Sequence, residues 1–454
     1  MTSRSHGITI HLVLAGLAGL ASLPVAALDL QQAWETLQLQ GPTYRSAVHE
    51  RDAGLENRAL GRAGLLPHIN ASASKNKVNG TQEQSGLPGG SIERDLDYDS
   101  ENLAVQLRQP LFNRQKLAEY RQGKQRANYS EAVFDAKTQN VAVRLANRYF
   151  DVLLTRETID LANAKLKAFE QQVAASDRRF KLGDGTITDV YQSAARRDLA
   201  QAELIEAQDN LLIAMRLLEE MLGEVPQHVA TLRHDFPIPP LHPNDLQAWM
   251  DKAQANNPAL RARDYSQRVA DEEVNRAKSG HWPTLDLVLG YTDSQSDSIS
   301  TINQQNRYAS VGLEFNMPLF AGGATSARVR QAVASREQSS EDLNATREEV
   351  YSSTTRQFRG VQSSEARINA LENAVMSSER AQDSAKKGFL AGASTNVDIL
   401  NAEEQVFIAR RDLLESKLRY LLARLQLSAA VGLLGDDDIS RANSYLGPEL
   451  VLGY

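Results

Sequence analysis

The stretch FKLGDGTITDV at residues 180–190 decides the fold, because FLAGASTNVDI at residues 389–399 repeats its pattern. Each stretch runs from a Phe through a Gly to a Thr, with an Asp three residues after that Thr. A glycine near the end of one helix, followed by a Thr-x-x-Asp capping box, is typical of a tight reversal between two helices. We therefore expect a helical hairpin around each stretch.

The chain around each stretch contains no proline over a long distance. Proline is absent between Pro110 and Pro226 and again between Pro318 and Pro448. One helix over residues 114–181 would be about 100 Å long, and a helix of that length needs neighbours along it. A coiled-coil seam is predicted by residues at seven-residue spacing, namely Leu400, Phe407, Leu414 and Leu421, with Leu418 and Leu425 beside them.

Two further blocks recur in the same order, which indicates an internal duplication. Pro42, Gly64 and Pro67 correspond to Pro258, Gly280 and Pro283, while Leu103, Pro110 and Phe112 correspond to Val311, Pro318 and Phe320. The predicted organisation is a first repeat at 28–225, a Pro-rich linker at 226–245, a second repeat at 246–433 and a C-terminal tail at 434–454.

Each half also has segments that alternate apolar and polar residues as strands do. Leu103, Val105 and Leu107 are separated by Ala104 and Gln106, and a similar alternation begins at Val311. We expect these strands to pair with earlier ones at 67–78 and 283–291, across polar loops at 79–100 and 292–305. One apolar and one polar face suit a lipid-facing barrel with a wet lumen, or equally a half-exposed periplasmic sheet. Four strands cannot close a barrel, so a barrel would need several chains.

The N-terminus and the composition restrict where the protein works. Arg4, an apolar run at 8–23 and the small residues at 25–27 predict a cleaved secretory signal peptide at 1–27; the alternative is an N-terminal membrane anchor. No later segment is apolar enough for a transmembrane helix. The chain has no Cys and a net charge of -7, so it lacks disulfides, an N-terminal lipidated Cys and a basic surface for nucleic acid.

Enzymatic interpretations find no supporting motif. His6 and His11 leave with the signal peptide, and His228, His234 and His242 lie in the linker. The sequence has no phosphate-binding loop, dinucleotide fingerprint or nucleophile elbow. We expect no catalytic site, no metal site and no cofactor.

The duplicated order of helix, two strands and long helical hairpin, together with the two hairpin stretches, resembles the TolC family of outer-membrane efflux and secretion channels. The resemblance covers essentially the whole mature chain. It implies a mainly α fold with a small β part, in which a homotrimer joins four strands per chain into a twelve-stranded barrel in outer-membrane lipid. The helical hairpins would form a coiled-coil tunnel across the periplasm, completed by a periplasmic adaptor and an inner-membrane ABC transporter or another pump.

In that family the periplasmic end of the tunnel is closed at an aperture with acidic rings. By position Asp398 corresponds to the first ring, and Thr188 and Asp189 to partners that hold the second hairpin closed. Asn401 replaces the acid of the second ring. Three Asp398 side chains near one axis would repel one another, raise their pKa values and attract cations.

The closing network also departs from the family pattern. Phe389 and Ser394 replace a tyrosine and an arginine, so closure must depend on other contacts or be weaker. The pore role of Asp189 and Asp398 remains open beside the capping role described above. The tips have two interpretations as well, as plain helix reversals or as the contact with the adaptor; they are Leu182, Gly183, Asp184, Ala391, Gly392 and Ala393.

The cargo is predicted from the missing Cys. Multidrug-efflux members of the family commonly have a lipidated N-terminal Cys, so its absence favours type I protein secretion. The alternatives are a multidrug or small-molecule efflux channel and, from another class, a periplasmic coiled-coil scaffold without a pore.

Overall fold

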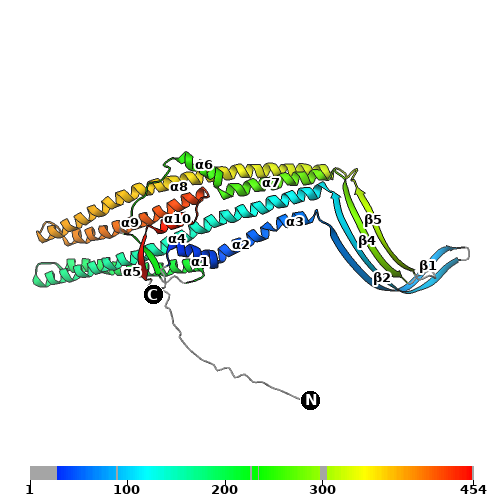
Figure 1. Cartoon of the computed structure of the whole chain (residues 1–454). Coiled ribbons are helices and arrows are strands. Elements are labelled where there is room, and N and C mark those ends of the chain that lie inside the picture. Colours follow the sequence, from blue (N-terminus) through cyan, green and yellow to red (C-terminus); the bar gives the residue numbers. More distant parts are fainter. Residues whose placement is uncertain (1–27, 88–89, 225–227, 234, 297–303, 452–454) are drawn as a thin grey trace, which may run out of the picture.

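The computed structural model describes residues 28–87, 90–224, 228–233, 235–296 and 304–451, which form one elongated molecule (Figure 1). Long helices make up most of its length, and a β-sheet forms one end. The predicted signal peptide at 1–27 lies outside the described residues. Within the described ranges, no helix is both long and apolar enough to cross a membrane.

Corresponding elements follow in the same order in the two halves, which confirms the duplicated, mainly helical fold. The first half contains α1 (Leu30–Gln40), α2 (Pro42–Leu55), α3 (Asn57–Ala63), β1 (His68–Leu87), β2 (Gly90–Phe112), α4 (Arg114–Leu182) and α5 (Ile187–Leu222). The second half contains α6 (Leu246–Asn256), α7 (Pro258–Ser279), β4 (Thr284–Ser296), β5 (Gln304–Asn316), α8 (Ala324–Leu390) and α9 (Asn396–Ala430).

The two long arms are single helices, as the absence of proline predicts. α4 has 69 residues and α8 has 67, so each is about 100 Å long at 1.5 Å per residue. α5 returns along α4 and α9 returns along α8 (Figure 1). On α9 the predicted seam is buried at Leu400, Leu418, Leu421 and Leu425 and half-buried at Phe407 and Leu414. Leu400 packs with Phe169 of α4 and Ala200 of α5, so this seam joins the two hairpins.

The four long strands form one antiparallel sheet in the order β1-β2-β4-β5. The register brings Ile69, Leu107, Leu289 and Val311 into one row across it. Because alternate residues point to opposite faces, one face of the sheet is apolar over this region. On the opposite face Arg108 pairs with Asp286 at 2.9 Å and with Glu314, which connects β2, β4 and β5. The predicted alternation and the pairing within each half are confirmed.

The prediction of polar loops at 79–100 and 292–305 was wrong over most of these two stretches. β1 continues to Leu87 and β2 begins at Gly90, so nearly all of 79–100 is strand, and β4 continues to Ser296. Ladder hydrogen bonds are made by the backbone, and polar side chains can therefore occupy a strand that is solvated on both faces. Opposite charges also face each other across the ladder, as in the Lys75–Glu101 pair at 2.6 Å. Residues 297–303 of the second predicted loop lie outside the described residues.

A belt of short elements surrounds the middle of the helices. β3 (His228–Leu232), within the Pro-rich segment, pairs with β6 (Leu446–Val451) of the C-terminal segment, which also contains α10 (Asp436–Asn443). The Trp34 indole donates to Asp436 at 2.8 Å, which ties α1 to α10. The buried Tyr149 hydroxyl of α4 donates to the Leu28 carbonyl and accepts from the Ala230 N–H. The two ends of the described chain thus meet at the centre of the long helices.

Candidate functional site: the free ends of the helical hairpins

Each hairpin reverses its direction at a glycine with positive φ. Gly183, directly after α4, has φ of 82°, and Gly392, shortly after α8, has φ of 76°. Side chains other than glycine rarely adopt this backbone conformation, so the tight reversal requires glycine there. The last residues of the two helices, Leu182 and Leu390, are 77% and 84% exposed, so both tips present apolar side chains to solvent.

The returning helices begin with the two predicted capping boxes. Thr186 caps α5, and its hydroxyl accepts from the Asp189 N–H at 3.2 Å while the Asp189 carboxylate accepts from the Thr186 N–H at 3.1 Å. Thr395 and Asp398 make the same reciprocal pair at the start of α9, at 3.2 and 2.8 Å. Each carboxylate also lies at the positive end of its helix dipole.

The hydrogen bonds of the second capping box lower the pKa of Asp398. Its carboxylate accepts hydrogen bonds from the Thr395 N–H and hydroxyl, which stabilise the charged form and lower its pKa. The predicted rise of this pKa concerns three Asp398 side chains at one axis and stays a prediction.

The predicted aperture residues lie on the first two turns of α5 and α9. Thr188, Asp398 and Asn401 are exposed, whereas Asp189 is half-buried. The first turns of the two helices are joined directly, because the Asn396 amide donates to the Asp189 carbonyl at 3.3 Å. The structure therefore brings the predicted residues of the two hairpins together at one end of the molecule.

A buried polar network surrounds Asn396, which is 2% exposed. Its amide donates to Ser193 Oγ at 3.1 Å, and its carbonyl oxygen accepts from the Gln172 amide at 2.6 Å. Ser193 in turn lies 3.1 Å from Ser176. One side chain of the second hairpin is thus hydrogen-bonded to both helices of the first.

Two positions that depart from the family pattern make contacts between the hairpins. Arg196 of α5 donates to Asn401 Oδ1 of α9 at 2.9 Å. The Arg179 guanidinium of α4 lies 4.3 Å from the centre of the Phe389 ring of α8, a cation–π contact. Asn401 and Phe389 therefore each make a contact between the hairpins, although the sequence predicted that these two substitutions would remove contacts that close the tunnel.

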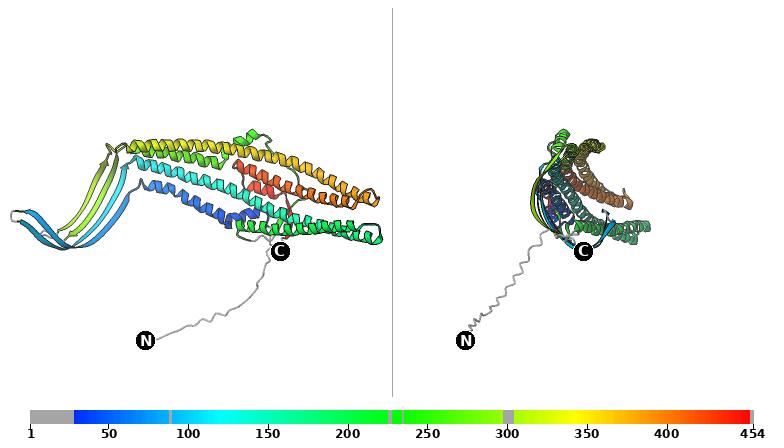
Figure 2. Two further views of the ribbon diagram at one scale, coloured as in Figure 1. Left: turned by 180° about the vertical axis from the view of Figure 1, so that it is seen from behind. Right: turned by 90° about the vertical axis from the view of Figure 1, so that its right-hand side faces the viewer.

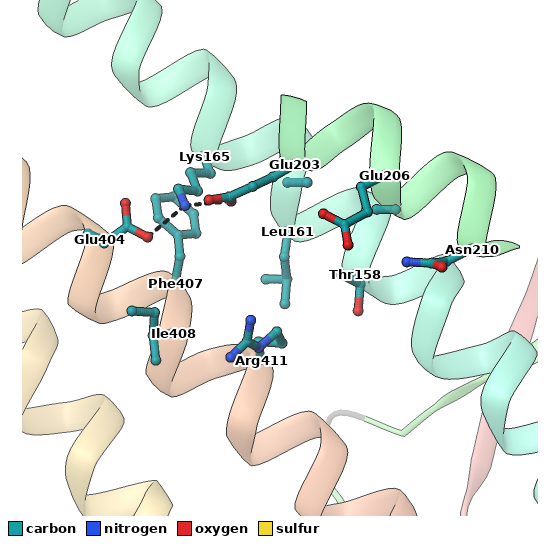
Figure 3. Close-up of a pocket in the computed structure, with 12 residues that line it drawn as sticks. Thr158, Leu161, Lys165, Glu203, Glu206, Asn210, Glu404, Phe407, Ile408 and Arg411 are labelled. Carbon is teal, nitrogen blue, oxygen red and sulfur yellow. Dashed lines mark hydrogen bonds and ion pairs between the residues drawn. The ribbon is translucent and has the colours of Figure 1, made fainter. Parts of the chain in front are cut away.

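Further from the tips, Lys165 of α4 connects three helices (Figure 3). Its side chain is 7% exposed, and its ammonium lies 2.6 Å from Glu203 of α5 and 2.7 Å from Glu404 of α9. The pair borders a cavity of about 360 Å³ between α5 and α9, into which Glu206 and Arg411 also project (Figure 3). An ammonium buried this far requires carboxylate partners, so the Lys165–Glu404 pair is a charged contact that joins the two hairpins.

Sequence reasoning missed Asn396, Arg196 and Lys165. A signal for Asn396 was present, because the duplication aligns it with the apolar Ile187. A buried polar residue at the position of an apolar one indicates a hydrogen-bonded role. Lys165 gave no such signal, since a lysine on a long helix is usually solvated. In the described ranges, no three acidic or His side chains are grouped as a metal ion would require.

Comparison with known proteins gives a consistent result. The model of the family described as "Outer membrane efflux protein" matches residues 28–224 and 249–433. The chain is 34% identical to the alkaline protease secretion protein AprF of Pseudomonas aeruginosa, over 91% of this chain and 86% of that protein. It is also 34% identical to the proteases secretion protein PrtF of Dickeya chrysanthemi, over 91% and 90%. Identity to the outer membrane protein TolC of Escherichia coli is 27%, over 95% and 87%.

Solved structures share the fold at lower identity. CusC superimposes with a TM-score of 0.76 at 17% identity, covering 89% of this chain and 92% of that one. The outer membrane protein VceC of Vibrio cholerae gives a TM-score of 0.74 at 19% identity, covering 89% and 96%.

Proposed function

Because the chain belongs to the outer membrane efflux protein family, and is therefore an outer membrane protein, we propose that it is the channel of a tripartite export system. One observation carries the proposal. A sheet with an apolar face stands at one end of the molecule, and two helices about 100 Å long, α4 and α8, extend from it. The sheet would lie in the outer membrane and the helices would cross the periplasm.

We propose a homotrimer. Seen along its length, the chain is a curved wall (Figure 2). β1 and β5 each have one edge without a partner in the described sheet, and a closed barrel of three chains would pair these edges. α5 also exposes Tyr191, Ile205 and Leu212 at multiples of seven residues, which suits a coiled-coil contact with another copy.

The hairpin ends form the proposed aperture. Asp398 and Asn401 would ring the axis, and Thr188 and Asp189 would lie beside them. The Asn396 network and the Arg196, Arg179 and Lys165 contacts support a closed resting state held by hydrogen bonds and ion pairs within each chain. The exposed tips around Gly183 and Gly392 would contact the periplasmic adaptor, which joins the channel to an inner-membrane ABC transporter.

The proposed cargo is protein, through type I secretion. The names of AprF and PrtF, which describe protease secretion, support it, and so does the absence of a Cys for lipidation. The domain limits at 28–225, 226–245, 246–433 and 434–454, and the signal peptide at 1–27, are part of the proposal.

Two kinds of experiment test the proposal, one on the purified protein and one on a deletion strain. Purified protein should run as a detergent-solubilised trimer and give conductance steps in a planar bilayer, and Asp398→Asn should reduce cation preference and block by multivalent cations. A monomer soluble without detergent would instead support a scaffold.

Deletion of the gene should remove one or a few proteins from the medium without changing drug susceptibility. Drug hypersensitivity with an unchanged secretome would contradict the protein cargo and indicate small-molecule efflux.

A further inference from the structure

The hairpin of β1 and β2 extends well beyond the rest of the described sheet. β2 pairs with β4 as far as Ser100, opposite Ser296, whereas β1 and β2 stay paired from Lys77 opposite Asp99 to Gln84 opposite Ile92. We call residues 77–84 and 92–99 the outer ribbon. It adds about 26 Å to the sheet at about 3.3 Å per residue.

One face of the outer ribbon is acidic. Its side chains are those of Lys77, Asn79, Thr81 and Glu83 on β1 and of Glu93, Asp95, Asp97 and Asp99 on β2. By strand alternation this face continues the apolar face that carries Leu103, Val105 and Leu107. The face proposed to contact lipid is therefore already charged near the end of the four-stranded sheet, at the Lys75–Glu101 and Arg307–Asp293 pairs, and it stays charged along the outer ribbon.

The opposite face changes in the reverse direction. Val78 lies directly opposite Tyr98, and Leu96 lies opposite Gly80. This face continues the polar side of the sheet, where Asn102 and Gln106 point. An apolar patch of Val78, Leu96 and Tyr98 thus lies on the face proposed to line the lumen, between the polar residues of the sheet and the Gln82–Arg94 pair of the outer ribbon.

The outer ribbon bends, and its apolar side chains are partly shielded from water. Figure 1 shows the hairpin of β1 and β2 turning away from the direction of the four-stranded sheet. Leu96 and Tyr98 are half-buried, whereas Asp95, Asp97 and Asp99 between and beside them are exposed. Two-stranded ribbons twist and coil more than wide sheets, and the bend lies where, in the described residues, β2 is no longer paired with β4.

We propose that in the assembled channel the inner faces of three outer ribbons meet, so that Val78, Leu96 and Tyr98 of three copies form an apolar collar across the exit. The inference rests on the proposed trimeric barrel. The occupant of each patch is another copy of this chain, because the patch is continuous with the luminal face and faces away from lipid. The acidic faces stay in water, and repulsion between their like charges disfavours a contact between two copies through these faces.

The dimensions allow this contact. Twelve strands spaced about 4.8 Å apart and tilted about 40° close into a barrel with a backbone radius of about 12 Å. Leu96 lies four residues beyond Ser100, about 13 Å along the ribbon. An inclination of about 25° would bring its backbone to about 6 Å from the axis, within reach of three apolar side chains.

Cross-linking tests the collar directly, because the chain has no native Cys. In the full-length trimer, Leu96→Cys and Tyr98→Cys should form covalent dimers with a short bismaleimide. The matched controls Asp95→Cys and Asp97→Cys, one residue away on the opposite face, should not. An intact trimer in which the inner positions fail to cross-link, cross-link no better than the outer ones, or cross-link to an exported protein instead would overturn the collar.

A second measurement does not depend on cross-linking. Gln106→Cys places a thiol on the proposed luminal face, and its labelling from outside the cell by a bulky maleimide reports on the exit. Adding Leu96→Ser and Tyr98→Ser should speed labelling about tenfold, equivalent to a barrier lower by about 1.4 kcal/mol; Asp95→Ser with Asp97→Ser should not. An unchanged rate would overturn the collar alone, whereas loss of trimers and of conductance steps would overturn the proposed function as well.

Discussion

Lys165 Nζ lies 2.7 Å from Glu404 Oε1, so a buried ammonium on α4 of the first hairpin is paired with a carboxylate on α9 of the second. Lys165 is about 25 Å above the tip of α4 at 1.5 Å per residue. The hairpins are therefore connected well behind the predicted aperture, and any opening that separates α9 from α4 must break this pair.

Replacing Lys165 with Met should lower the free energy of unfolding by about 1–2 kcal/mol. The loss is smaller than that of a fully buried pair, because Glu203 is 52% and Glu404 23% exposed and water partly replaces the ammonium. Urea unfolding of the purified protein measures the change. Lys167→Met, two residues away on an exposed side chain, is the control. Equal effects of the two variants would contradict a role for the buried pair.

Asn396→Ala should destabilise the protein by about 1–3 kcal/mol, because it removes the acceptor of the half-buried Gln172 amide and the donor to the buried Ser193 hydroxyl. It should also increase the time that the channel spends open in a planar bilayer. A double-mutant cycle with Gln172→Ala measures the coupling between the hairpins. Asn163→Ala, which removes an exposed amide of α4, serves as a control for stability. Independent, additive effects of Asn396→Ala and Gln172→Ala would contradict the network.

The Asp398 cap should give a pH dependence with a defined sign. Its pKa is lowered in the folded chain by the Thr395 hydrogen bonds, so its stabilisation is present above its ordinary pKa of 3.8. The stabilisation is lost as the pH falls from there through the folded pKa. Asp398→Ala should thus destabilise at pH 7 and have little effect in strong acid, as followed by urea unfolding at each pH. Asp184→Ala at the exposed tip is the control. A pKa of Asp398 above 3.8 in the trimer would show that repulsion between copies outweighs the cap.

Tyr149→Phe should lower stability by about 1–3 kcal/mol. The hydroxyl is buried between Leu28 and Ala230, and its loss leaves a backbone carbonyl and an N–H unpaired. Burial also raises the pKa of Tyr149, so the group stays neutral in the folded chain. The matched control is Tyr351→Phe, whose hydroxyl donates to Gln254 in an exposed contact. Thermal unfolding compares the two variants, and similar shifts would contradict the role of Tyr149 in fixing the belt.

The hairpins could be predicted from local chemistry. Gly183 and Gly392 allow the reversal, Thr186 and Thr395 cap the next helix, and the missing prolines allow helices of this length. Such signals act within a few residues and are therefore visible in the sequence. Strand alternation was visible for the same reason, but the strand ends were not. Residues 79–86 are polar or Gly, and the pairing of this stretch is decided by the backbone ladder with β2.

The contacts between the hairpins could not be predicted, because they join residues far apart in the chain. Lys165 pairs with Glu404, and Gln172 with Asn396, across more than 200 positions. Whether a lysine is solvated or buried depends on which helices surround it. The same holds for the belt, where β3 in the Pro-rich segment finds β6 at the other end of the chain.

The sequence by itself therefore determined the duplication, the helical hairpins, their caps and the alternation of the strands, since each depends on short-range spacing. The tertiary structure alone decided which polar groups connect the hairpins near the predicted aperture and how far the outer ribbon extends. Those features depend on burial and on pairing between distant segments. A buried charge or amide becomes a connection only when the packing of α4, α5 and α9 removes water from it.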